Sequence, residues 1–155
     1  MQSDTTTEHP PVPEGCIDEM RMELSPRLSA ISSLAEVIEE FGKNHNIPDA
    51  PIYFVNLEID ELMTNYVAYA FRKVRKPRMN VILRTFADKL VLVVEDSGPP
   101  FNPLETEEPD LSAGIEERRI GGMGLHLVRK YPDHIDYQCV DDRNILTLEH
   151  KFGDA

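Results

Sequence analysis

Apolar and charged positions alternate along the first patterned stretch of the chain. Met20, Met22 and Leu24 are separated by single charged residues, which is the period of a strand with one buried face. This pattern predicts a strand over Cys16–Leu24. Prolines and small polar residues dominate the preceding residues, and such a composition resists both helix and sheet. We therefore expect a disordered or loosely packed tail over 1–16 and a single domain over 17–155.

The next two segments carry the period of helices. Apolar residues recur at spacings of three and four across 28–41, directly after a Ser25-Pro26 pair that suits a helix N-terminus. This predicts a helix that ends near Gly42. A broader apolar face predicts a second, mostly covered helix over 52–74, with a loop over 43–51 between the two helices.

Two pairs of β-branched and apolar runs predict antiparallel hairpins. The first pair is joined at Asp88-Lys89 and the second by the polar residues 141–144. The four strands are expected over 79–87, 90–95, 135–140 and 145–152. Strands and helices are segregated along the chain, without the alternation of a doubly wound fold. The predicted fold class is α+β, a two-layer α/β sandwich in which helices cover one face of a mixed antiparallel sheet.

One stretch between the two hairpins carries no regular period. Residues 99–120 contain four prolines and a group of acidic residues. Long loops of this kind inside a domain are often functional, so we interpret the stretch as a lid. The glycine-rich segment 121–131 follows it and is expected to open a short helix.

Charge and hydropathy exclude several classes of function. The chain has 16 Lys and Arg against 28 Asp and Glu, for a net charge of -12. This charge repels a phosphate backbone and argues against direct binding of nucleic acid. No apolar run approaches the length that spans a bilayer, and the polar start of the chain lacks the apolar core of a signal peptide. We therefore expect a cytoplasmic protein without membrane contact.

The first candidate for chemistry is a polar pair in the second predicted helix. Glu61 and Asn65 lie four residues apart, which places both side chains on one helix face. A carboxylate can take a proton or orient a hydroxyl, and an amide oxygen is a hard ligand suited to Mg²⁺. The same spacing is common on ordinary polar helix faces, so the pair alone fits either interpretation.

The second candidate follows the apolar run of a predicted strand. Asp96 at the end of that strand can accept a hydrogen bond from an exocyclic amino group such as that of adenine. Gly98 lets a planar ring approach the backbone closely. The alternative is an ordinary turn, which these residue types and the prolines after them also favour.

The third candidate is the glycine cluster that opens the last predicted helix. Gly121, Gly122 and Gly124 leave backbone N–H groups unhindered at a helix N-terminus, where a phosphate binds readily. The chain has no GxxxxGK[ST] sequence, so a Walker lysine cannot contribute. A flexible hinge is the alternative for these glycines.

Taken in order, these three segments resemble the N, G1 and G2 boxes of the GHKL superfamily, whose members share the Bergerat ATP-binding fold. The matching elements are ExxxN on a helix, DxGxPF after a strand and GGMGL before a helix. Over about Met20–Phe152 the chain resembles the stand-alone anti-sigma-factor serine/threonine kinases of bacterial partner-switching systems. This resemblance implies ATP and Mg²⁺ as cofactors.

The resemblance also implies a role for each matching residue. Glu61 corresponds to the general base or hydroxyl-orienting carboxylate, Asn65 to the Mg²⁺ ligand and Asp96 to the residue that recognises adenine. The other implied cofactor contacts are Gly98, Phe101, Gly121, Gly122, Met123, Gly124 and Leu125. The chain departs from the family pattern at Tyr69, where many relatives have His, and at Asn102, where many have Asp.

As a function, the resemblance implies an ATP-dependent kinase that phosphorylates a serine or threonine of an anti-anti-sigma protein. It further implies a sigma factor as a second protein partner and a homodimer as the assembly. One alternative is a non-catalytic ATP-binding module that regulates a protein partner. A detached catalytic domain of a histidine kinase is a further alternative, although no phosphoacceptor helix is evident in the sequence.

Overall fold

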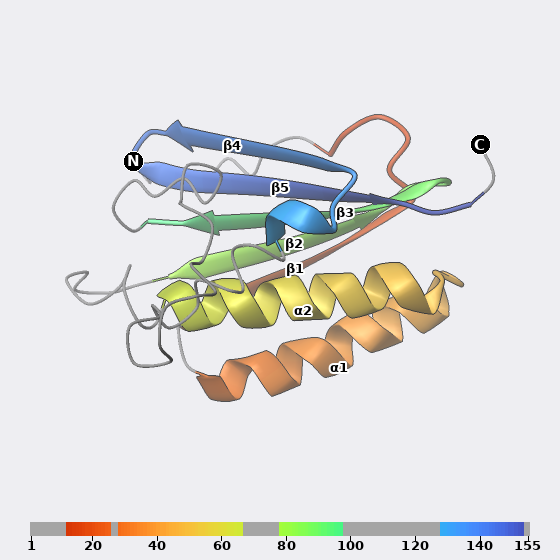
Figure 1. Ribbon diagram of the computed structural model, residues 1–155, viewed down its shortest axis with the longest axis horizontal. Coiled ribbons are helices and arrows are strands. Elements are labelled where there is room, and N and C mark those ends of the chain that lie inside the picture. The colour runs from red at the N-terminus through yellow and green to blue at the C-terminus, as the bar shows by residue number, and fades with distance from the viewer. Residues whose placement is uncertain (1–11, 26–27, 67–77, 98–127, 154–155) are drawn as a thin grey trace, which may run out of the picture.

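The computed structural model describes residues 12–25, 28–66, 78–97 and 128–153. In these residues, two long helices lie against one face of a single five-stranded sheet, and a further helical turn covers 128–130 (Figure 1). In chain order the strands and long helices are β1 (Asp18–Leu24), α1 (Leu28–Asn44), α2 (Asp49–Asn65), β2 (Met79–Thr85), β3 (Lys89–Asp96), β4 (His134–Val140) and β5 (Arg143–Lys151). This confirms the predicted two-layer α+β fold.

The sheet has the strand order β1-β2-β3-β5-β4, and all four strand pairs are antiparallel. Strand β5 lies between β3 and β4. Its pairing with β4 forms a hairpin, whereas its pairing with β3 joins two strands that are far apart in the sequence. The register places Asp96 at the end of β3 opposite Asn144 near the start of β5. The carboxyl end of β3 therefore lies beside the amino end of β5, at one end of the sheet.

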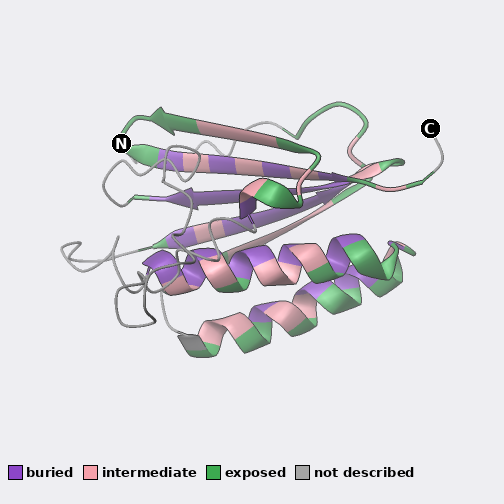
Figure 2. Ribbon diagram, in the orientation of Figure 1, coloured by how far each residue is buried: buried purple, intermediate pink, exposed green. Residues whose placement is uncertain are grey.

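Alternation along the strands separates a helix-facing side from an outer side, as the strand period requires. Figure 2 shows the buried residues concentrated in β2, β3 and β5 and on the sheet-facing sides of the helices. The main core includes Leu34, Ile38, Val55, Leu62, Met63, Val81, Leu83, Leu92, Val94 and Leu148. Met20 and Met22 pack against this core from β1, so their alternation reflects core packing.

The loop between the helices is shorter than the sequence indicates. The second helix begins at Asp49, three residues before the expected start, and Pro51 lies in its first turn. Proline is tolerated there because the first N–H groups of a helix have no partner within the helix. The predicted continuation of this helix to residue 74 lies outside the described residues beyond Tyr66.

The last hairpin also turns more tightly than expected. Strand β4 ends at Val140 and β5 begins at Arg143, so the turn consists of Asp141 and Asp142. Both residues have positive φ, 51° and 61°, which is the conformation that two-residue hairpin turns require. Asn144, expected in the turn, is instead a buried strand residue.

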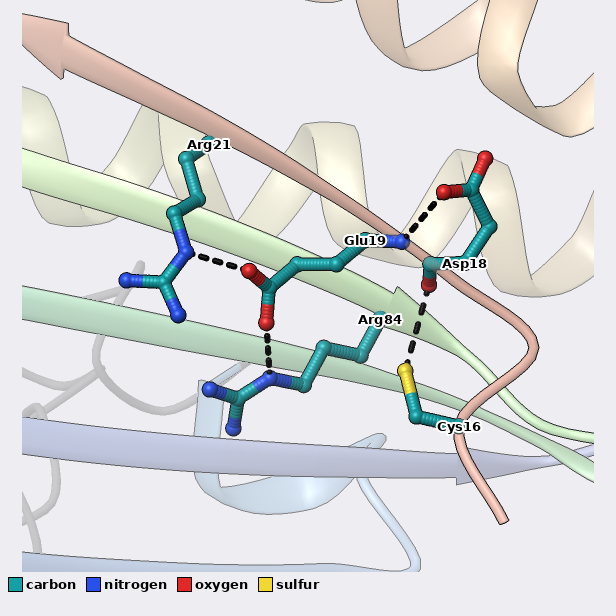
Figure 3. Close-up of polar contacts among 5 residues, drawn as sticks. All are labelled: Cys16, Asp18, Glu19, Arg21 and Arg84. Carbon is teal, nitrogen blue, oxygen red and sulfur yellow. Dashed lines mark hydrogen bonds and ion pairs between the residues drawn. The ribbon is translucent and has the colours of Figure 1, made fainter. Parts of the chain in front are cut away.

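A charged cluster lies on the sheet face opposite the helices. Glu19 in β1 accepts hydrogen bonds from the guanidinium Nε atoms of Arg21 and Arg84, the latter at 2.7 Å (Figure 3). The side chains of Glu19 and Arg84 are only 15% and 7% exposed. Burial raises the pKa of Glu19, but the hydrogen bonds and charges of the two arginines outweigh this effect and hold the pKa below its ordinary value.

Among the described residues, no helix combines the length and the apolar character that crossing a membrane would need.

Candidate functional site

The carboxyl end of α2 positions the first two candidate residues. Asn65 is 5% exposed, and its side-chain Nδ2 donates a hydrogen bond to the backbone carbonyl of Glu61 at 2.9 Å. This bond sets the orientation of the Asn65 amide. Burial, together with the negative charge of neighbouring Asp60, raises the pKa of Glu61. A carboxylate with a raised pKa is better matched to proton abstraction near neutral pH.

The end of β3 positions the third candidate. Asp96 is 3% exposed and lies on the helix-facing side of the sheet. Leu92 and Val94, at every second position before it in β3, face the same side and belong to the core. Its Oδ1 accepts a hydrogen bond from Nδ2 of Asn144 at 2.9 Å. The Oδ1 atom of Asn144 in turn accepts a hydrogen bond from the hydroxyl of Tyr137 in β4. Asp96 is thus held by side chains from the two strands that follow it in the sheet.

A fourth polar residue joins the end of α2 to the end of β3. Tyr66 directly follows Asn65, is 3% exposed and donates a hydrogen bond from its hydroxyl to Asp96. Burial, the charge of Asp96 and this hydrogen bond all raise the pKa of Tyr66. The hydroxyl therefore stays protonated and remains a donor. Through Tyr66, the helix end that carries Asn65 is anchored at the carboxylate of Asp96.

The donor set suits a nucleotide with a divalent cation. Because Nδ2 of Asn65 is engaged with a carbonyl, the amide oxygen is the atom through which this residue would hold Mg²⁺. The carboxylate of Glu61 lies one turn away on the same helix face. Asp96, which receives donors from Asn144 and Tyr66, acts as an acceptor, and a carboxylate has acceptor sites for a further amino group. The residues present therefore fit adenine and a hard cation.

The other predicted contacts fall outside the described part of the chain. Gly98, Phe101 and the lid over 99–120 lie outside the described residues, as do Tyr69 and Asn102. The same holds for the predicted phosphate contacts Gly121, Gly122, Met123, Gly124 and Leu125. The described chain resumes at Val128, in the last turn of the short helix expected after the glycines.

Several polar residues near the candidate site were not identified from the sequence. Tyr66 and Tyr137 are indistinguishable from core aromatic residues in an apolar pattern, and Asn144 resembles a turn residue. Glu58 gave a usable signal, because it is a charged residue among Val55, Ile59 and Leu62 on the apolar face of α2.

Residues 24–150 of the chain match the family model of the histidine kinase-like ATPase domain. The chain belongs to this family. The match confirms the GHKL membership that the three sequence segments indicate. ATPases of this family bind a nucleotide, and the buried polar cluster at the ends of α2 and β3 contains Asn65 and Asp96, two of the residues predicted to contact it.

Curated relatives are kinases. The chain is 29% identical over 96 residues to the serine/threonine-protein kinase BtrW of Bordetella bronchiseptica, an alignment that covers 62% of this chain and 68% of that protein. It is also 29% identical over 103 residues to the serine-protein kinase RsbW of Listeria monocytogenes, covering 63% of this chain and 64% of that protein. The alignment therefore spans slightly less than two thirds of the Listeria relative.

Among solved structures, the chain is similar to the histidine kinase domain of the blue-light activated histidine kinase from Erythrobacter litoralis. The TM-score is 0.46 at 15% sequence identity, with 79% of this chain and 59% of that chain covered.

Proposed function

We propose that this kinase-like ATPase domain is a serine/threonine protein kinase that transfers the γ-phosphoryl group of ATP to an anti-anti-sigma protein, and that it also binds and inhibits a sigma factor. The observation that carries the proposal is the meeting of the Asn65 helix end with Asp96, through Tyr66, in a chain of the histidine kinase-like ATPase family. The kinase relatives support a protein hydroxyl as the phosphoryl acceptor.

Each candidate residue has a distinct role in this proposal. Asp96 accepts a hydrogen bond from the amino group of adenine, and Asn65 holds Mg²⁺ through its amide oxygen. Glu61 accepts the proton of the attacking hydroxyl, a role that its raised pKa supports. When bound, Mg²⁺ would supply positive charge to the phosphates, and Gly121, Gly122 and Gly124 would contribute backbone N–H groups to them.

The proposal separates nucleotide binding from phosphoryl transfer. Positioning and charge stabilisation supply most of the catalysis of phosphoryl transfer, and a general base adds roughly 10² to 10⁴ in rate. Loss of Glu61 therefore removes most of the transfer rate while it leaves the adenine and cation contacts intact. Loss of Asn65 weakens the Mg²⁺-dependent part of ATP binding.

The direct test measures ATP binding by calorimetry with and without Mg²⁺, together with transfer of ³²P from γ-labelled ATP to candidate anti-anti-sigma proteins. We expect Glu61→Ala to retain ATP affinity within about threefold and to lose about 10² or more of the transfer rate. Asn65→Ala should lose the gain in affinity that Mg²⁺ provides. Glu40→Ala, an equivalent change at an exposed position of α1, is the matched control and should alter neither property.

The outcomes distinguish the kinase from the non-catalytic module. Tight ATP binding without transfer to any antagonist, and with regulation of the partner unaffected by Glu61→Ala, would establish the module instead. Absence of ATP binding would overturn both. Phosphohistidine on a separate partner would identify a histidine kinase. Light scattering of the same samples tests whether a homodimer forms.

A further inference from the structure

We propose that Asn144 and Tyr137 are positioning residues that hold Asp96 as a hydrogen-bond acceptor and thereby select a purine with a 6-amino group. The inference rests on the proposed nucleotide function and extends it to two residues that no sequence motif indicates. It concerns a hydrogen-bonded series that runs from Tyr137 in β4, through Asn144 in β5, to Asp96 in β3.

The chemistry of the three side chains gives this series one direction. An ionised carboxylate can only accept hydrogen bonds, so the group of Asn144 that faces Asp96 must be the amino group Nδ2. The amide oxygen of Asn144 then faces Tyr137, whose hydroxyl can donate to it. Reversal of the Asn144 amide would bring two acceptors together at Asp96 and would leave the Tyr137 hydroxyl facing an amino group. The Asp96 carboxylate therefore sets the orientation of the Asn144 amide, and the Tyr137 hydroxyl holds the amide there by donating to its oxygen.

Burial makes the arrangement rigid and costly to disturb. Asp96 and Asn144 are each 3% exposed, and they lie opposite one another in the β3–β5 register. A buried polar group that loses its partner costs about 1–3 kcal/mol, more when it is charged. Tyr66 adds a donor from the end of α2. The carboxylate is consequently fixed from the sheet and from the helix before any ligand arrives, which is the condition for precise recognition.

A fixed acceptor discriminates between purines by what they present at position 6. The amino group of adenine donates to the carboxylate, whereas the carbonyl of guanine or hypoxanthine would place a second acceptor against it. Sites built to hydrogen-bond one group reject analogues that cannot make the bond, because buried polar groups are then left unpaired. The selectivity therefore depends on the orientation of Asp96 as well as on its presence.

The experiment measures a ratio of affinities, which loss of overall stability does not by itself change. ATP, inosine triphosphate and the triphosphate of purine riboside, which has hydrogen at position 6, are titrated into the full chain by calorimetry. For the unmodified protein we expect ATP to bind at least tenfold more tightly than either analogue. Tyr137→Phe should reduce this preference about threefold or more, and Asn144→Leu about tenfold, with affinity for the purine riboside analogue nearly unchanged.

Two further variants complete the test. Tyr53→Phe removes a hydroxyl from an exposed tyrosine of α2 and is the matched control, for which the preference should not change. Asn144→Asp places a second carboxylate opposite Asp96, and two such groups share a proton, so one can become a donor. This variant should shift the preference toward inosine triphosphate.

Each outcome decides the inference. An unchanged preference for ATP in Tyr137→Phe and Asn144→Asp, with the protein folded by circular dichroism, overturns it while the proposed function stands. If Asn144→Leu does not fold, the other two variants decide. If the unmodified protein binds none of the three nucleotides, the proposed function fails and this inference fails with it.

Discussion

Glu58 in α2 and His150 in β5 form a hydrogen-bonded pair between Oε1 and Nε2 that is buried at both ends, with side-chain exposures of 1% and 4%. Phe54, one helical turn before Glu58, stacks on the His150 ring with a centroid distance of 5.8 Å and on Tyr131 at 4.7 Å. The pair joins the helix that carries Glu61 and Asn65 to the strand that carries Asn144. Burial raises the pKa of Glu58, and the contact with His150 opposes this only in part.

The raised pKa of Glu58 makes the stability of the fold depend on pH in a definite direction. Between the ordinary pKa of a glutamate and the raised value, the folded state holds a proton that the unfolded state has released. The contribution of Glu58 to the free energy of unfolding therefore falls as the pH rises through this window. Glu58→Gln should abolish that decline, as measured by urea unfolding across the acid range. A parallel pH dependence in the two proteins would contradict this expectation.

Removal of the partner tests the same pair from the other side. His150→Ala leaves the Glu58 carboxylate buried without its imidazole and should lower the free energy of unfolding by about 3–5 kcal/mol at neutral pH. Glu58→Gln in the same background should recover part of the loss, because it removes the uncompensated charge. Additive effects of the two changes would show that the residues are not coupled.

Glu19 should show the opposite pH dependence. Its pKa is lowered in the folded state, so its contribution to stability is present above the ordinary pKa and is lost as the pH falls through the lowered value. Glu19→Gln should lower the free energy of unfolding by about 1–3 kcal/mol at pH 7, since Arg21 and Arg84 lose their charged partner. The difference from the unmodified protein should vanish in acid.

An exposed pair between Glu23 in β1 and Arg78, the residue directly before β2, provides the control. Glu23 and Arg78 approach to 3.5 Å with side chains 58% and 69% exposed. Glu23→Gln should change the unfolding free energy by less than about 1 kcal/mol at either pH, because exposed ion pairs contribute little. A cost as large as that of Glu19→Gln would mean that burial is not the deciding factor.

Gly42 allows close packing of α1 against α2. A Cβ atom at this position would lie 2.8 Å from both Cδ1 and Cγ1 of Ile52. Gly42→Ala should therefore destabilise the fold by about 1 kcal/mol, because the strain of overpacking exceeds the gain in helix propensity. In an Ile52→Ala background the same change should become stabilising by up to about 1 kcal/mol. Thermal unfolding of the double-mutant cycle measures the reversal, and a cost of equal size in both backgrounds would refute it.

The raised pKa of Glu61 predicts the acid side of the pH profile for phosphoryl transfer. If Glu61 is the base, kcat/KM falls as the pH drops through the pKa of Glu61, which lies above the ordinary glutamate value. Asp60→Asn removes a neighbouring charge that contributes to the raised pKa, so the fall should move to lower pH. Glu40→Gln, on α1, should leave the profile in place. If the pH profile of kcat/KM is the same in Asp60→Asn as in the unmodified protein, the titrating group is not Glu61.

The helices and strands could be predicted where the spacing of apolar residues in the sequence reflects which side chains are buried. Alternation of apolar and polar residues identified β1, β4 and β5 within a few residues. Continuous apolar runs identified β2 and β3, which are buried along nearly their whole length. The position of β5 between β3 and β4 was not predicted, since local pattern identifies a strand without naming its neighbour. The early start of α2 was missed because Pro51 was interpreted as a loop residue.

For the candidate site, sequence analysis identified residues that belong to a recognisable motif. It missed the residues whose contacts form only when distant strands pair in the folded protein. Asp96 was expected at the end of an apolar strand, and the structure places it there, buried. Its role in binding adenine stays a prediction. Asn144 gave no signal, because its contact with Asp96 arises only when β5 pairs with β3, 48 residues earlier in the chain.

The insertion of β5 between β3 and β4 has a consequence for biosynthesis. While the ribosome has released the chain only to β4, the hydrogen-bonding edge of β3 has no strand to cover it, and β4 has nothing to attach to. An open apolar edge of this kind is prone to aberrant association, so nascent chains stalled at that point should be substrates for chaperones. Asp96 acquires its Asn144 partner only after β5 docks, so the purine selection proposed above would arise in the same late event that completes the sheet.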